Sequence, residues 1–254
     1  MNKILSTAIG QNVTIGEGVF IDTNVTIEDN VIIEDGCYIT GNTIIEQNVR
    51  LSPYVSIGTP GEHKYKITEK YDEVRIGANS IIREFVTINA PVEKNGITQT
   101  GKNCYLMSKS HMGHDSILGD ECVLSTGSMI GGHAQLGDYV TVGLNAIVHQ
   151  WVIIGDASMI GALTPVSKDV LPFTLVRGSP ARWYKINKIG MQIENRFDHN
   201  EIETVSKIFD ELSNEQEINE LFLEKGLEIK NIRLRDIYKN FEIKSHRGIV
   251  KYGG

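Results

Sequence analysis

A repeat of six residues constrains this chain more than any other feature of its sequence. Aliphatic residues recur at every sixth position across residues 9–57, return in the same phase across residues 76–88, and continue from residue 106 to residue 166. A smaller, often β-branched residue usually stands two positions earlier, and small or acidic residues often follow. Each unit therefore predicts a short strand followed by a turn.

A period of six fits neither an amphipathic helix nor a meander of hairpins. It is typical of the hexapeptide β-helix, in which three units make one triangular coil of eighteen residues. Successive coils stack at the spacing of hydrogen-bonded strands, about 4.8 Å, so residues eighteen apart lie over one another. We therefore predict an all-β, left-handed parallel β-helix.

Two interruptions and one change of pattern divide the chain. Residues 59–75 and 90–99 break the repeat and are rich in charge, Gly and Pro, so we expect loops that leave the prism, where ligand contacts tend to lie. After the repeat the pattern becomes helical. The sequence predicts a β-helix domain over residues 1–182 and a C-terminal helical domain over residues 183–254.

Capping signals define two helices in that C-terminal part. Asn200 is placed to cap a helix whose apolar residues share one face. Ser213 with Gln216 three residues later has the form of a capping box for the next helix.

Composition narrows the class of protein. The chain has 32 acidic and 25 basic residues, a net charge of -7, and no dense basic run, which disfavours nucleic acid as a partner. Three cysteines do not form a secreted disulfide framework, so we expect a reducing compartment, the cytoplasm. No stretch approaches the roughly eighteen apolar residues of a membrane span, and no signal peptide is expected.

The step of eighteen brings polar residues together in the later coils. From His114 it reaches Gly132 and then Gln150, and from Asp115 it reaches His133. These residues form two adjacent columns on one corner of the prism, within about 10 Å of one another. Such convergence of polar groups is what an active site needs.

The types of residue at this corner suggest acyl transfer. His114 is the candidate general base, and Asp115 would hold its tautomer and stabilise the protonated ring. The backbone N–H of Gly132 is the candidate donor to an oxyanion. No Cys or Ser accompanies the His-Asp pair as a nucleophile, so we expect direct attack without a covalent intermediate.

These residues also allow other interpretations. A single histidine in a repeat is more often an ordinary turn residue, but four at one corner beside an acid favour a site. His111 and His114 lack a nearby cysteine, so we expect no metal. Cys104 and Cys122 stack by the same step and are expected to be small inward side chains. A non-catalytic scaffold would need only the repeat.

Three segments carry a resemblance to a known family. Residues 107–115 (MSKSHMGHD), 130–133 (IGGH) and 148–150 (VHQ) resemble the acyl-(acyl-carrier-protein):UDP-N-acetylglucosamine O-acyltransferases, the first enzymes of lipid A synthesis, and the resemblance covers nearly the whole chain. It implies a homotrimer with sites in the clefts between subunits. It also implies that His114 is the base and Gly132 the oxyanion donor.

The resemblance also implies contacts with the nucleotide sugar or the acyl chain. The positions concerned are His111, His133, His149, Gln150 and Asn187. Glu62 and Lys64 lie in a Glu-His-Lys-Tyr stretch that is similar to the family's Asp-Leu-Lys-Tyr loop, and are expected to reach the site from the neighbouring subunit.

The chain departs from the family pattern at three places. Asn89-Ala90-Pro91 stands where the family commonly has His-Arg-Gly, and the family's arginine pair has only Arg196 close by. A glycine associated with room for a long acyl chain is Ala162 here, which would shorten the pocket.

The expected function is transfer of an acyl group from acyl carrier protein to the 3-hydroxyl of UDP-N-acetylglucosamine, with no cofactor beyond the thioester itself. The alternative is an acyl-coenzyme A-dependent N-acyltransferase that modifies a dTDP- or UDP-linked amino sugar for a surface polysaccharide.

Overall fold

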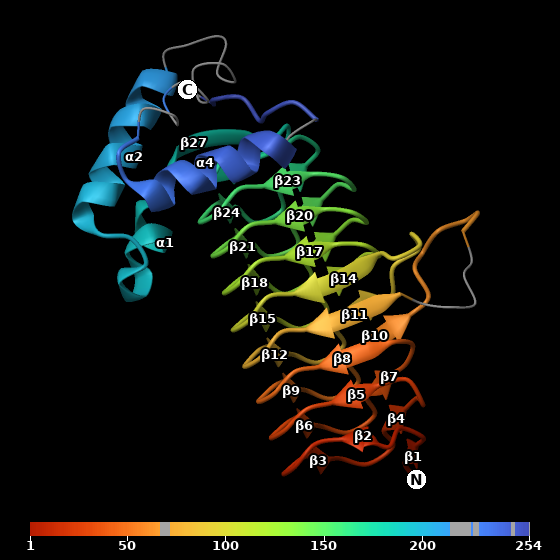
Figure 1. Ribbon diagram of the computed structural model, residues 1–254. Helices are drawn as coiled ribbons and strands as arrows, with labels where there is room; N and C mark the ends of the chain where they lie inside the picture. The colour runs from red at the N-terminus through yellow and green to blue at the C-terminus, as the bar shows by residue number, and fades with distance from the viewer. Residues whose placement is uncertain (67–71, 214–224, 226–228, 245–246, 254) are drawn as a thin grey trace.

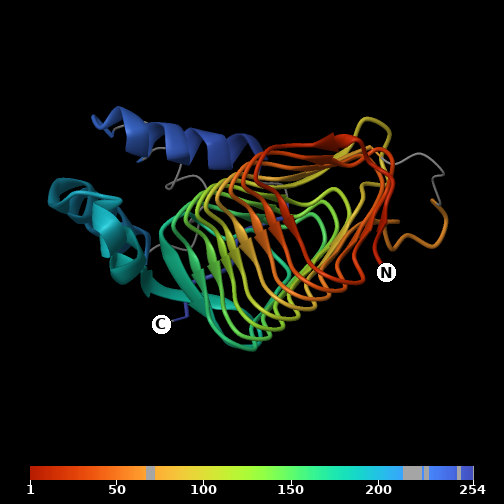
Figure 2. The same cartoon turned by 90° about the horizontal axis from the view of Figure 1, so that it is seen from below.

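Short parallel strands form three sheets, which are the sides of a triangular prism (Figures 1 and 2). The computed structural model describes residues 1–66, 72–213, 225, 229–244 and 247–253. The chain winds as a left-handed parallel β-helix, and each coil gives one strand to each sheet in turn. The predicted fold is confirmed.

The strands of the three sheets, called A, B and C, are as follows. Sheet A contains β1 (Lys3–Ile4), β4 (Phe20–Ile21), β7 (Tyr38–Ile39), β10 (Ser56–Thr59), β13 (Thr87–Asn89), β16 (His111–Met112), β19 (Met129–Ile130), β22 (Ile147–Val148) and β25 (Pro165–Val166). Sheet B contains β2 (Ala8–Ile9), β5 (Thr26–Ile27), β8 (Thr43–Ile45), β11 (Glu73–Ile76), β14 (Ile97–Thr100), β17 (Ile117–Leu118), β20 (Gln135–Leu136) and β23 (Ile153–Ile154). Sheet C contains β3 (Thr14–Ile15), β6 (Ile32–Ile33), β9 (Arg50–Leu51), β12 (Ile81–Ile82), β15 (Tyr105–Leu106), β18 (Val123–Leu124), β21 (Thr141–Val142), β24 (Met159–Ile160), β26 (Thr174–Arg177) and β27 (Arg182–Ile186).

Strand register follows the step of eighteen residues. His111 pairs with Met129, and Met129 pairs with Ile147. The repeated aliphatic residues point into the prism, where those from Ile21 onward are at most 3% exposed; Ile9 and Ile15 in the first coil are partly buried. A buried side chain of this kind contributes about 1.5–3 kcal/mol. The stacked aliphatic columns therefore hold the coils in register and fix the turns between them.

The two cysteines of the stacked pair behave as predicted. Cys104 and Cys122 are free, and each is at most 1% exposed in the interior. Burial is the main reason why the pKa of the Cys122 thiol is raised well above its ordinary value. They serve as small inward side chains.

The ends of both predicted loops belong to sheet B. Strand β11 begins at Glu73, and β14 begins at Ile97 and pairs with it over four residues. The inward positions of β14 are Thr98 and Thr100, both at most 2% exposed. The aliphatic repeat could not show this strand because its inward residues are polar. The segments between strands are thus shorter than predicted.

The end of the prism also differs from the predicted boundary. Strand β27 pairs with β26 in antiparallel fashion and extends sheet C to Ile186, beyond residue 182. The helical elements are α1 (Lys188–Gln192), the 3₁₀ helix η1 (Ile193–Asn195), α2 (His199–Leu212) and α4 (Ile232–Lys244). Figure 1 shows α2 and α4 at the C-terminal end of the prism.

Helix α2 begins earlier than expected. Asp198, not Asn200, is its N-cap: the Asp198 carboxylate accepts the Glu201 N–H, and Glu201 accepts the Asp198 N–H. The predicted apolar face is buried as expected. The proposed capping box of Ser213 lies partly outside the described residues, because Gln216 is not among them. Within the described parts of the chain, every helix is too short or too polar to cross a membrane.

Candidate active site

The predicted site lies on the turns that lead from sheet A to sheet B. We call these turns, residues 113–116, 131–134 and 149–152, the A–B corner. Main-chain hydrogen bonds link them: the His133 N–H donates to the His114 carbonyl at 2.9 Å, and the Trp151 N–H donates to the Gly132 carbonyl at 3.0 Å. The two predicted columns are therefore adjacent in the structure.

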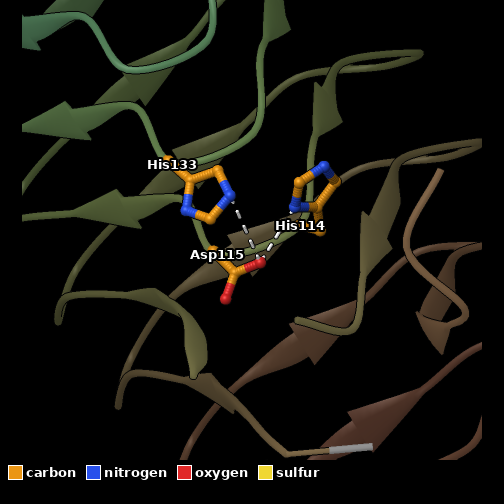
Figure 3. A group of neighbouring side chains, drawn as sticks. All are labelled: His114, Asp115 and His133. Carbon is orange, nitrogen blue, oxygen red and sulfur yellow. Dashed lines mark hydrogen bonds and ion pairs between the residues drawn. The ribbon is translucent and has the colours of Figure 1, made fainter. Parts of the chain in front are cut away.

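A histidine and an aspartate form the centre of this corner (Figure 3). Nδ1 of His114 lies 2.9 Å from Oδ2 of Asp115, and the two residues are only 7% and 9% exposed. The same carboxylate oxygen accepts the Val92 N–H at 2.9 Å, and the Asp115 N–H donates to Oγ1 of Thr98 at 2.8 Å. The carboxylate is therefore held from both the turn and the segment before β14.

The charge state of Asp115 fixes the tautomer of His114. Burial by itself raises the pKa of Asp115, but hydrogen bonds from His114 and from the Val92 N–H, with the nearby His133, bring the pKa below its ordinary value. A carboxylate only accepts hydrogen bonds, so Nδ1 of His114 carries the proton. Nε2 of a neutral His114 is then a free acceptor for a proton.

Gly132 lies directly against the His114 ring. A Cβ at this position would be 2.7 Å from both Cε1 and Nε2 of His114, so any larger residue would displace the imidazole. Gly132 is buried, and its N–H has no acceptor among the described residues. A buried N–H without a partner is rare in folded proteins and is suited to binding a developing negative charge.

His133 completes the group. Its Nε2 lies 3.9 Å from Oδ2 of Asp115, and its ring is perpendicular to His114 with 5.0 Å between the centroids. Trp151 stacks on the other side at 3.7 Å and 5°. Burial lowers the pKa of His133, and the charge of Asp115 partly opposes this shift. No role was predicted for Trp151, although the step of eighteen points to it.

His111, His149 and Gln150 lie around this group. Nδ1 of His111 is 2.7 Å from Oγ1 of Thr87, and burial lowers the pKa of His111, with the charge of Glu62 acting in the opposite direction. His149 and Gln150 are exposed, and Nδ1 of His149 donates to the Gln150 carbonyl at 3.1 Å. The structure thus keeps all three near the A–B corner.

The segment with Glu62 and Lys64 differs from the expectation. It lies beside His114 of its own chain: the His63 ring is 6.0 Å from the His114 ring, and a Cβ on Gly61 would be 2.8 Å from the Cβ of His114. Glu62 and Lys64 are both exposed. This segment therefore reaches the corner without a neighbouring subunit.

Three predicted contacts lie elsewhere on the prism. Ala162 is in the turn from sheet C to sheet A. Asn187 caps α1 with its Oδ1 and donates from Nδ2 to the Ala157 carbonyl at 2.9 Å, in the turn from sheet B to sheet C. Nη2 of Arg196 lies 3.1 Å from Oε2 of Glu121, which is in the turn from sheet B to sheet C two coils earlier. One chain therefore does not bring these residues to His114.

The group also has the composition of a metal site. His114, Asp115 and His133 each offer a ligand atom, and these atoms lie within 4.8 Å of one another. Two nitrogens and one carboxylate are a set that zinc accepts. However, Oδ2 of Asp115 already accepts hydrogen bonds from His114 and from Val92. The sequence argued against zinc at His111 and His114, which is a different set of residues from this group. The absence of a metal remains a prediction.

A separate cavity of about 440 Å³ lies beside the C-terminal helices. Trp183, Asn187 and Phe209 are among its lining residues, and no residue of the A–B corner borders it. Its size would suit a small ligand, but only Asn187 among the predicted contacts lies there.

Two family models match the sequence of this chain, one in the early coils of the β-helix and one over the C-terminal residues. A family model described as bacterial transferase hexapeptide (six repeats) matches residues 6–41 and 24–59, and one described as UDP N-acetylglucosamine O-acyltransferase, domain 2, matches residues 169–250. A relative from Campylobacter lari, named acyl-(acyl-carrier-protein)–UDP-N-acetylglucosamine O-acyltransferase, is 40% identical over 227 residues, which are 83% of this chain and 84% of the relative. One of the same name from Campylobacter concisus is 35% identical, over 82% and 72% of the two chains.

Solved structures are similar over nearly the whole chain. The UDP-N-acetylglucosamine acyltransferase from Campylobacter jejuni has a TM-score of 0.89 at 29% identity, and the match covers 99% of this chain and 98% of that one. The enzyme from Bacteroides fragilis has a TM-score of 0.90 at 27% identity, with 98% of both chains covered.

Proposed function

Because the chain belongs to the family of acyl-(acyl-carrier-protein)–UDP-N-acetylglucosamine O-acyltransferases, we propose that it performs the reaction for which its relatives are named. An acyl group passes from the thioester of acyl carrier protein to the 3-hydroxyl of UDP-N-acetylglucosamine, as the first step of lipid A synthesis. The observation that carries the proposal is the His114 imidazole, whose Nδ1 is fixed by Asp115 and whose Nε2 has no hydrogen-bond partner among the described residues.

His114 acts as general base and then as general acid. Its Nε2 takes the proton of the sugar hydroxyl while the hydroxyl oxygen forms a bond to the thioester carbonyl carbon. The charge of Asp115, 2.9 Å from Nδ1, stabilises the imidazolium that results. When the tetrahedral intermediate collapses, the C–S bond breaks and the imidazolium protonates the thiolate. The products are the sugar ester and the free thiol of the carrier.

Gly132 supports the same step through its backbone. The carbonyl oxygen becomes negatively charged in the tetrahedral intermediate, and the unpaired N–H of Gly132 is a preorganised donor beside Nε2 of His114. Donors of this kind contribute about 10²- to 10³-fold in rate. The hydroxyl attacks directly, so the reaction needs no cofactor.

Relatives of this chain carry the names of O-acyltransferases, which disfavours the N-acyltransferase with coenzyme A as donor. The two functions differ in both substrates. UDP-N-acetylglucosamine should raise the melting temperature of the protein and accept acyl groups from acyl carrier protein. Stabilisation by dTDP-linked amino sugars alone, with turnover only of coenzyme A esters, would support the other function.

A homotrimer is part of the proposal. Asn187 and Arg196 lie near the turn from sheet B to sheet C, so only a second copy could place them opposite His114. On the outer face of sheet A, Met129 and Ile147 are each 50% exposed, which leaves apolar area for such a contact. Native mass spectrometry should find three chains, and a monomer that is fully active would exclude a shared site.

We also propose that the protein is located in the cytoplasm. The three cysteines are free and buried, which is compatible with a reducing compartment. Fractionation of the producing cells, with detection by antibody, would place the protein.

Substitution of the base tests the proposed mechanism. The variant His114→Ala should lose about 10²- to 10⁴-fold in kcat, because general base catalysis contributes that much. The matched control is His199→Ala, since His199 is an exposed histidine of α2 whose Nε2 contacts only Glu203 among the described residues. Turnover of His114→Ala near the wild-type rate, in an enzyme that folds, would refute the role.

A further inference from the structure

His63 places a second imidazole beside the candidate base. Its ring centroid is 6.0 Å from that of His114, and the two rings are inclined at 76°. His63 is partly buried, between two exposed charged neighbours, Glu62 and Lys64. No role follows for it from the family resemblance, because the similar loop of the family has leucine at this position.

Main-chain hydrogen bonds fix the tautomer of His63. Its Nδ1 is 3.2 Å from the N–H nitrogen of Tyr65 and 3.0 Å from that of Lys66. Backbone N–H groups only donate, so Nδ1 is the acceptor and the neutral ring carries its proton on Nε2. Among the described residues, no side chain or carbonyl accepts that Nε2–H.

The two imidazoles are therefore complementary. His114 has its proton on Nδ1 and offers Nε2 as an acceptor, whereas His63 offers Nε2–H as a donor. A sugar hydroxyl that gives its proton to His114 has oxygen-bearing groups on the neighbouring carbons. The centroids of the two rings are 6.0 Å apart, which leaves room for substrate atoms between them. An oxygen next to the reacting hydroxyl could then accept the Nε2–H of His63.

The His63 segment is fixed relative to the base. Lys66 forms an ion pair with Glu93, which lies one residue after Val92. Val92 in turn donates to the carboxylate of Asp115. A Cβ on Gly61 would be 2.5 Å from Cγ1 of Val92 and 2.8 Å from the Cβ of His114, so this backbone approaches the corner as closely as glycine allows.

We propose that His63 is a substrate-binding residue that donates a hydrogen bond from Nε2 to an oxygen substituent flanking the reacting hydroxyl of the acceptor sugar. This inference rests on the proposed function. The contact exists before the reaction starts, so its loss weakens sugar binding and leaves the chemical step at His114 nearly intact.

Two variants separate the hydrogen bond from packing. His63→Leu removes the donor and keeps an apolar side chain, and His63→Gln keeps an N–H donor. Loss of a neutral hydrogen bond weakens binding by about threefold to tenfold, which corresponds to about 0.6–1.4 kcal/mol. We expect His63→Leu to raise both KM and Kd for UDP-N-acetylglucosamine about threefold to tenfold, with kcat within about twofold. His63→Gln should recover most of this loss.

The control is His199→Leu, the same change at an exposed helical position, which should leave KM and Kd unchanged. Kd is measured by calorimetry without the acyl donor, so it reports on His63 even if acyl transfer fails. Wild-type Kd in His63→Leu, or a loss confined to kcat, would overturn the inference alone. A wild-type protein that binds UDP-N-acetylglucosamine without acylating it would overturn only the proposed function, and one that does not bind it would overturn both.

Discussion

Two corners of the prism are built from the same repeat and are used differently. We call the turns from sheet B to sheet C the B–C corner. Here side-chain carboxylates accept hydrogen bonds from the backbone N–H groups of the turns. Oδ1 of Asp29 accepts the Gln11 N–H at 2.7 Å, and Oδ1 of Asp120 accepts the Lys102 N–H at 2.8 Å. Asp138 does the same for the N–H of Asp120 at 2.8 Å. In these coils a carboxylate thus accepts the backbone N–H of the coil before it.

At the A–B corner the same turn position is left open. His114, Gly132 and Gln150 replace the aspartates there, and the Gly132 N–H has no acceptor among the described residues. The comparison shows that one position in the repeat can satisfy the backbone or serve chemistry. A carboxylate that closed this turn would also fill the place of the substrate oxyanion.

The next position in the turn has the same backbone conformation at both corners. It has positive φ, and at the B–C corner Asn30, Asn48 and Asn103 occupy it, with φ of 59°, 60° and 56°. Asparagine adopts this left-handed region more readily than most residues. At the A–B corner His133 and Trp151 hold φ of 60° and 66°. The later coils of the B–C corner also place other residues there, since Glu121, Tyr139 and Ala157 have φ of 55°, 62° and 53°. Both corners therefore accept this backbone strain in the later coils.

Removing the charge of Asp115 should have the largest effect on activity. Asp115→Asn keeps the size of the side chain but removes the charge that stabilises the His114 imidazolium, and kcat should fall about 10²- to 10⁴-fold. The matched change at the B–C corner, Asp120→Asn, should leave kcat within about twofold. Steady-state kinetics of both variants check this, and equal kcat values would remove the distinction between the corners.

Adding a methyl group to Gly132 should have the next largest effect. Its Cβ would meet the His114 ring at 2.7 Å, so the base must shift and kcat should fall about tenfold to 10²-fold. Gly119→Ala, one turn position earlier, is a comparison at the B–C corner, where a Cβ would meet Oδ1 of Asp138 at 2.4 Å. That variant should lower the melting temperature and keep its kcat. A fully active Gly132→Ala would show that the ring tolerates the methyl group.

Loss of one carboxylate that accepts a backbone N–H at the B–C corner should reduce stability and leave activity unchanged. Asp138→Ala leaves the Asp120 N–H without its acceptor at 2.8 Å. Because Asp120 is exposed, water can replace part of this hydrogen bond. The free energy of unfolding should fall by about 0.5–1.5 kcal/mol, with unchanged kcat. Urea denaturation followed by circular dichroism measures the difference. A loss of activity without a loss of stability would contradict the structural role of this corner.

The smallest predicted effect is on the pH dependence of stability. Burial lowers the pKa of His133 below its ordinary value of 6.5, so the folded state favours the neutral ring more than the unfolded chain does. This contribution is present above pH 6.5 and is lost as pH falls through the lower pKa of the folded state. His111 acts in the same direction.

His133→Asn should therefore show a smaller fall in melting temperature than the wild type between about pH 7.5 and about pH 5. Asparagine also suits the positive φ at this position, so the variant should fold. Identical slopes for the two proteins would mean that His133 titrates alike in the folded and unfolded states.

The fold and the core of the site could be predicted because the repeat is regular where they lie. A step of eighteen residues found the columns of His114 and Asp115 without any coordinates, since strand pairing fixes that step. The same rule could not find β14, whose inward residues Thr98 and Thr100 are polar.

Contacts made by insertions were beyond the reach of the sequence. His63 and Val92 approach His114 and Asp115 through segments outside the repeat, and no spacing predicts where such a segment returns. The start of α2 was missed by two residues because Asp198 and Asn200 are both good capping residues, and only the reciprocal bond with Glu201 decides between them.

A crystal structure with UDP-N-acetylglucosamine bound would show whether the acceptor sugar lies against His114. We expect the reacting hydroxyl oxygen within about 2.6–3.2 Å of Nε2 of His114, on the same side as the Gly132 N–H. A sugar whose hydroxyl groups all lie beyond hydrogen-bonding distance of His114, such as one ordered in the cavity lined by Trp183 and Phe209, would contradict this expectation.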